Sequence, residues 1–211
     1  MEQSYIDNFK RSLGKYVPAS AVEPLFDFLA QHKVHLHITR ERFSKLGDYR
    51  WPQHQHRYHE ISVNGNLNCY HFLQVMLHEM GHLNTFLQYG TAVQPHGHEW
   101  QAAYARLLVQ YRNCFPAELH PLLTAYTQRI PLSRTLEKEL DAQLHHYDED
   151  YNPATDITLN NLMPGTRFHV AARPERHFEA LEKRRTRWIC LCCEDGKKYL
   201  VSGTAQVVVD P

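Results

Sequence analysis

The feature that most constrains this chain is the run His78-Glu79-Met80-Gly81-His82, an H-E-x-x-H motif inside a segment with the apolar spacing of a helix. On an α-helix, side chains four residues apart project from the same face, about one turn apart. The imidazoles of His78 and His82 can therefore converge on one metal ion, and Glu79 can reach a water on that ion. A chain with sixteen histidines also produces such spacing by chance, so the surrounding residues decide between the two interpretations.

Those residues predict a long central helix at about 68–89. Asn66 or Asn68 can cap its N-terminus, and Gly90 can end it. Apolar residues at helical spacing form its predicted buried stripe: Leu73, Met76 or Leu77, Met80, Leu83 or Asn84, and Leu87. Further helices are expected at 3–14, from Pro18 to Leu29, and at 98–113, 117–128 and 133–147. Strands are expected at 34–39 and 59–63, around a loop or irregular hairpin at 44–57.

The periodicity changes after the acidic stretch 146–153, which is expected to be a linker. Turn signals then separate short runs with the alternation of strands, at 165–170, 187–191, 198–201 and 205–209. The sequence therefore predicts an α+β chain. It has a mainly helical domain with a short β-sheet at 1–150, followed at 155–211 by a small antiparallel β module, a compact barrel or a curled sheet.

A catalytic zinc usually has three protein ligands and one open position, so a third ligand is expected after the central helix. A metzincin would have its third histidine where this chain has Gln88, and a glycine where it has Thr85, so that class is excluded. The loop after the helix is long enough to return to it. It brings three candidates near the motif, His96, His98 and Glu99.

The motif at 78–82, followed by H-G-H-E-W at 96–100, resembles the SprT-like family, which includes the Spartan DNA–protein crosslink proteases. That family carries H-E-x-x-H and then H-G-x-E-[FW]. The stretches 46–50 and 61–64 also resemble the hairpin before the family's active-site helix. The likeness covers roughly residues 20–112, and the two-part signature is much more specific than H-E-x-x-H alone.

The resemblance implies that His78, His82 and His96 bind Zn²⁺ and that Glu79 is the catalytic base. His98 then occupies a variable position of the pattern. It further implies that 1–150 is a zincin-like metalloprotease domain acting on protein substrates, including proteins bound or crosslinked to DNA. His71, two turns before His78 on the same face, is interpreted as an ordinary packed or solvated histidine.

Two features of the β module could extend this function. Cys190, Cys192 and Cys193 lack the second cysteine pair of a zinc ribbon, so they are interpreted as ordinary strand cysteines. The chain thus resembles bacterial members of the family whose C-terminal β module holds no metal. The basic stretch Lys183–Arg187, next to Trp188, has the composition of a surface that contacts phosphates and stacks bases, which makes DNA a candidate partner. The simpler interpretation is a solvated hairpin face.

Bulk composition adds little about partners. The chain has 23 basic and 23 acidic residues, so its net charge gives no argument for nucleic acid or an anionic membrane. Five cysteines without disulfide-like spacing, and no apolar segment of membrane-spanning length, predict a cytoplasmic protein with no membrane partner. The oligomeric state is not predicted.

Three functions remain open from the sequence. The first is a zinc metallopeptidase, and the second is a binding module for nucleic acid or protein in which zinc is structural. The third is a zinc amidase acting on a small molecule. Glu79 favours the first, because a structural zinc site is closed by protein ligands and needs no base beside it.

Overall fold

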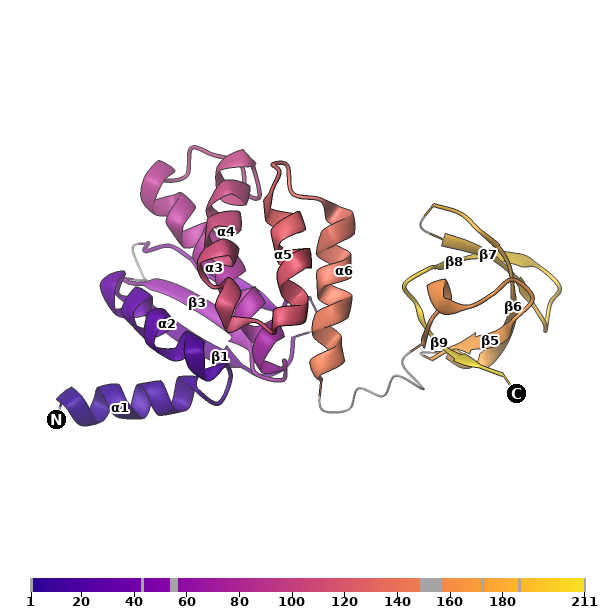
Figure 1. Cartoon of the computed structure of the whole chain (residues 1–211), viewed down its shortest axis with the longest axis horizontal. Coiled ribbons are helices and arrows are strands. Elements are labelled where there is room, and N and C mark those ends of the chain that lie inside the picture. The colour runs from indigo at the N-terminus through magenta and orange to yellow at the C-terminus, as the bar shows by residue number, and fades with distance from the viewer. Residues whose placement is uncertain are drawn as a thin grey trace. The chain divides into compact units, whose positions relative to one another are not determined.

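The computed structural model divides into two compact units, Met1–Glu149 and Asp150–Pro211, each with its own hydrophobic core (Figure 1). It describes residues 2–42, 44–53, 57–148, 157–171, 173–185 and 187–210. The first unit combines helices with a small sheet and the second is a β-sheet, so the predicted α+β class is confirmed. None of the helices in the described part combines the length and apolar character needed to cross a membrane.

The first unit begins with two helices and a three-stranded sheet. Its elements are α1 (Glu2–Leu13), α2 (Ala19–Gln31), β1 (Val34–Thr39), β2 (Gly47–Arg50) and β3 (His59–Asn64). The strand order is β1-β3-β2, with β1 parallel and β2 antiparallel to β3. The segment predicted as a loop or irregular hairpin therefore contributes an edge strand, β2, while residues 54–56 lie outside the described residues.

Helical elements complete this unit. They are α3 (Cys69–Tyr89), α4 (His98–Gln110), η1 (Arg112–Cys114), η2 (Ala117–Leu119), α5 (His120–Thr127), α6 (Arg134–Leu144) and η3 (His145–Tyr147). The helices predicted at 98–113, 117–128 and 133–147 are thus present, each partly as a 3₁₀ turn. Asp148 is still tied to the unit by hydrogen bonds from His145 and Asn68, so the predicted linker begins later than 146.

The central helix α3 has the predicted caps. The Asn68 side chain accepts hydrogen bonds from the backbone N–H groups of Tyr70 and His71. At the other end Gly90 adopts φ 62° and its N–H donates to Phe86, which closes the last turn. The predicted stripe is buried as far as Leu83. Leu87 is 48% exposed, and residues 88–90 are exposed as well, so the last turn of α3 lies outside the core.

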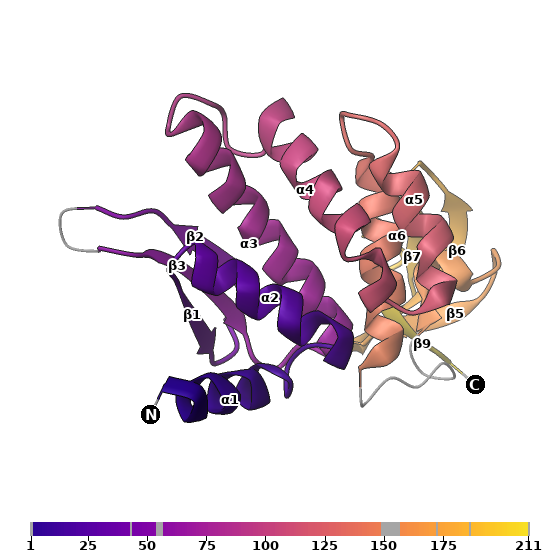
Figure 2. The ribbon, with the colours of Figure 1, turned by 60° about the vertical axis from the view of Figure 1, so that its left-hand side comes forward.

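Helix α3 packs against β2 and β3 on one side and against α4 and α6 on another (Figure 2). Its neighbours bury side chains around most of its circumference, as expected of a helix inside a core. The largest fully buried side chains at this centre are Phe72, Leu73, Met76, Leu77, Met80, Leu83, Tyr104 and Leu108. A helix held on several sides is a rigid support for the side chains that it projects.

The second unit is one antiparallel sheet of order β4-β9-β5-β6-β7-β8. The strands are β4 (Ile157–Thr158), β5 (Arg167–Val170), β6 (Arg173–Lys183), β7 (Arg187–Cys192), β8 (Lys198–Ser202) and β9 (Gln206–Val209), with η4 (Leu159–Asn161) after β4. Figure 1 shows the sheet curling around its core. Cys190 and Cys192 alternate with half-buried residues along β7 and are buried in that core, as ordinary strand cysteines are.

The longest strand of this unit, β6, was not predicted. Only Phe178 and Ala180 of its eleven residues are buried, and charged residues flank them on both sides. A bulge between Ala180 and Glu182 then shifts the register of its pairing with β7. The alternation of buried and exposed residues that identifies a strand is therefore limited to the middle of β6. Its two ends are strand only through their pairing with β5 and β7.

Candidate metal centre

The structure brings three histidines together at the middle of α3. His78 and His82 project from α3, and His96 approaches from the loop before α4. Nε2 of His96 lies 3.1 Å from Nε2 of His78 and 3.1 Å from Nε2 of His82. The three potential ligand atoms form one of the candidate metal-binding groups among the described residues.

This geometry fits a tetrahedral zinc ion. A zinc–nitrogen distance of 2.0–2.1 Å puts two ligand nitrogens of a tetrahedron about 3.3 Å apart, close to the separations from His96. Burial lowers the pKa of His78 to about 3 and that of His82 to about 4, and it also lowers the pKa of His96. All three rings are therefore neutral at pH 7 and offer lone pairs to a metal.

The loop holds His96 in an uncommon backbone conformation. Its φ is 57°, in the left-handed region that non-glycine residues rarely adopt. The side-chain amide of Gln101 donates to the His96 carbonyl at 2.9 Å, and Gly97 donates from its N–H to Gln94. A Cβ at Gly97 would lie 2.9 Å from the Gln94 carbonyl oxygen, so only glycine fits this tight turn.

The indole ring of Trp100 packs close to all three histidine rings. Its ring centroid lies 4.6 Å from that of His78, 5.2 Å from that of His82 and 4.4 Å from that of His96. Gly81 leaves room for the indole, since a Cβ there would come within 3.1 Å of Nε1 of Trp100. Sequence reasoning gave neither residue a role in the site, although the aromatic position of the family pattern was a signal for Trp100.

Glu79 is buried on the side of α3 that faces β2, outside the group of potential ligands. A Cβ at Gly47 would lie 2.5 Å from Oε1 of Glu79, so the backbone of β2 closely approaches this carboxylate. Burial raises the pKa of Glu79 to about 8, and the negative charge of Asp48 acts in the same direction. A carboxyl group with a raised proton affinity can both accept and return a proton near neutrality.

The other two candidate ligands are elsewhere. His98 is the exposed first residue of α4, and Glu99 follows it in the first turn. Neither belongs to a candidate metal-binding group of the described residues. The turn at Gly97 directs His96 toward α3, while the next residues enter the new helix.

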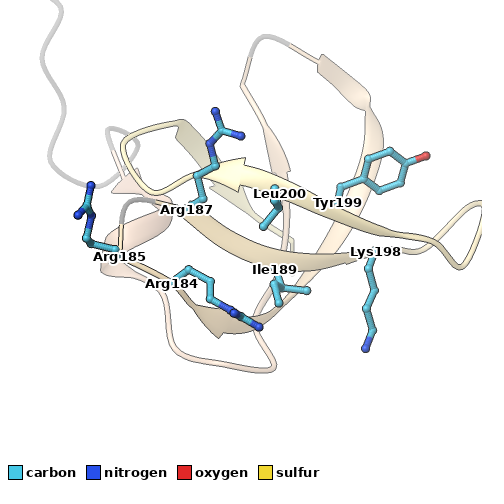
Figure 3. A pocket seen from close by; sticks show the side chains of 7 residues that line it. All are labelled: Arg184, Arg185, Arg187, Ile189, Lys198, Tyr199 and Leu200. Carbon is cyan, nitrogen blue, oxygen red and sulfur yellow. The ribbon is translucent and has the colours of Figure 1, made fainter.

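A hollow of about 490 Å³ lies on the β module (Figure 3). Four cationic side chains surround it, and three uncharged residues complete its lining: Arg184, Arg185, Arg187 and Lys198, with Ile189, Tyr199 and Leu200. Trp188 is not available to stack on bases, which was one of the two interpretations of the basic stretch beside it. Its side chain is buried and donates from Nε1 to Asn160, because alternation along β7 turns it to the core.

The arrangement in the first unit defines a class. An H-E-x-x-H helix beside a short sheet, with a third histidine delivered by the following segment, is a metallopeptidase-type domain whose histidines could hold a metal. The model of the SprT-like family matches residues 19–120, a segment that includes the helix with the H-E-x-x-H motif and the loop that carries His96. Searches of curated proteins and of solved structures gave no match.

Proposed function

We propose that this protein is a zinc-dependent metallopeptidase that hydrolyses protein substrates. One observation carries the proposal: Nε2 of His96 lies 3.1 Å from Nε2 of both His78 and His82, and the same helix turn carries a buried carboxylate that is not in the ligand group. His78, His82 and His96 would hold the zinc through Nε2. When bound, zinc would polarise a carbonyl and lower the pKa of a water at the centre.

The chain's own residues account for the proton transfers. Glu79 would accept a proton from the attacking water and donate it to the leaving amine nitrogen, as a general base that becomes a general acid. Its burial favours the protonated form, whereas the positive charge of a bound cation opposes that shift. Gly47 and the backbone of β2 restrict where the carboxylate can lie.

The sheet supports a polypeptide substrate over a small molecule. β2 is an edge strand that pairs with β3 on one side, and it lies directly beside Glu79. An extended peptide can add to such an edge through backbone hydrogen bonds, which recognise a chain of any sequence. A zinc amidase for small molecules would have no use for this edge.

DNA is the second partner in the proposal. Four cationic side chains around a partly apolar hollow on the β module suit phosphate contacts together with contacts to bases. Binding there would direct the peptidase to proteins held on DNA. The competing function, a binding module with a structural zinc, shares this surface but predicts no hydrolysis.

The test is casein digestion by the full-length protein, first treated with a chelator and then resupplied with zinc. Cleavage should disappear on chelation, return with zinc, and stay absent in His96→Ala, with single-stranded DNA present in parallel reactions. Zinc-loaded wild-type protein that cleaves nothing, with or without DNA, would contradict the peptidase and leave the binding module. Cleavage by His96→Ala at the wild-type rate would contradict the assigned centre.

A further inference from the structure

A second group of potential metal ligands lies toward the N-terminal end of α3. His71 is seven residues before His78 on this helix, which corresponds to about 10 Å along its axis. Asp141 near the end of α6 and His145 at the start of η3 are four residues apart and face it. One ligand atom of each side chain lies within 4.8 Å of the other two.

The spacing within this group matches that of metal ligands. Nε2 of His71 lies 3.3 Å from Oδ1 of Asp141, the separation expected for two ligands on one tetrahedral zinc ion. The imidazoles of His71 and His145 have centroids 5.0 Å apart and are nearly perpendicular. The pairs in the first centre are similar, with centroids 4.7 to 5.1 Å apart.

Hydrogen bonds with residues outside the ligand group orient His145. Its Nδ1 lies 2.7 Å from Oδ2 of Asp148, and Asn68 donates from its side-chain amide to Oδ1 of Asp148 at 2.6 Å. A histidine that binds metal through one nitrogen commonly donates from the other to a carboxylate, which fixes its tautomer. This pairing leaves Nε2 of His145 as the nitrogen available to a cation.

His71 is the buried member of the group. Its side chain is 3% exposed, and its Nε2 faces Oδ1 of Asp141, so the nitrogen that would bind a metal is already directed at the carboxylate. Asp141 and His145 are more than half exposed, so a cation could reach the group from solvent.

We propose that His71, Asp141 and His145 form a second metal site, structural in role, for a divalent transition metal of which zinc is the representative. Two imidazoles and one carboxylate form a ligand set for zinc, cobalt or nickel, whereas calcium and magnesium prefer oxygen ligands. A metal there would join the start of α3 to the end of α6. It would thus fix the last helix of the unit to the helix that carries the proposed catalytic centre.

The test isolates this site by removing the first. Full-length His78→Ala/His96→Ala, prepared without a histidine tag, is titrated with Co²⁺ and followed by d–d absorption and calorimetry. This background should bind one equivalent fewer than the parent protein. Adding Asp141→Asn or His145→Gln should remove one further equivalent, while His146→Ala on the same 3₁₀ turn should retain it; the group of His169, His177 and Asp210 is intact in every variant and cancels in these differences.

Two controls keep the outcome clear. Circular dichroism verifies that each variant is folded, and zinc should raise the Tm of the background but not that of its Asp141→Asn derivative. No binding by the folded background, or a stoichiometry that neither Asp141→Asn nor His145→Gln lowers, would overturn the second site. The proposed peptidase is judged separately, because Asp141→Asn in the parent protein should lose one equivalent of metal while cleaving casein normally.

Discussion

Replacement of Gly47 by alanine tests how closely the sheet controls Glu79. The added Cβ would lie 2.5 Å from Oε1 and 2.9 Å from Cγ of Glu79, and 2.8 Å from Cγ1 of Val75. Ordinary Cβ contacts begin near 3.4 Å, so the carboxylate or β2 must move by most of an ångström. A displacement of about 1 Å in a catalytic group costs about 10²-fold in rate, equivalent to about 2.7 kcal/mol.

The assay measures kcat/KM for a fluorogenic peptide with the sequence of a casein cleavage site, and the zinc content is determined on the same protein. Gly47→Ala should lose about 10²-fold in kcat/KM while retaining the zinc of its first centre, because no histidine is touched. Gly65→Ala is the matched control, since its Cβ would meet Ile38 at 2.8 Å, away from Glu79. Both variants should lose about 1–3 kcal/mol of stability from overpacking. Equal activity of Gly47→Ala and the wild type, or an equal activity loss in Gly65→Ala, would show that the close approach of β2 does not position Glu79.

Three further predictions concern other parts of the chain. Trp100→Ala removes the buried ring beneath the three histidines, so it should cost about 3–5 kcal/mol in urea unfolding and weaken zinc binding measured by chelator competition. Arg184→Ala/Arg187→Ala should weaken single-stranded DNA binding in fluorescence anisotropy and flatten its dependence on salt, and unchanged binding would remove DNA from the proposal. The hydrogen bond to Asp210 raises the pKa of His177. Desolvation alone would raise the pKa of Asp210, but its interactions with His177 and His169 together lower it. Wild type should therefore be more stable than Asp210→Asn between about pH 4 and 6.5. That difference in stability should shrink as pH rises through the raised pKa of His177, and also as pH falls through the lowered pKa of Asp210. The measurement is the Tm of both proteins as a function of pH.

Features that depend on nearby residues were predictable from the sequence. The bounds of α3 follow from Asn68 and Gly90, whose capping roles depend on their own chemistry. The convergence of His78 and His82 follows from helical geometry alone. The approach of His96 could be narrowed to a short loop by chain length, but the choice among three candidates needed the family resemblance.

Features that depend on residues far apart in the sequence were not predictable. The contact of Gly47 with Glu79 exists because β2 lies against α3, and no local pattern encodes that distance. His71 was interpreted as an ordinary histidine because its partners lie about seventy residues later, on α6 and η3. Base stacking next to the basic stretch was considered from composition alone, whereas the alternation along β7 buries Trp188.

The role of Glu79 is tested most directly by the casein cleavage rate of Glu79→Gln, with the zinc content determined on the same sample. We expect wild-type zinc content and a rate lower by about 10²–10⁴-fold, because the amide keeps the shape of the side chain but cannot accept the proton. Glu139→Gln, an exposed glutamate on α6, should behave as wild type. Loss of zinc in Glu79→Gln, or cleavage at the wild-type rate, would contradict the role assigned to this residue.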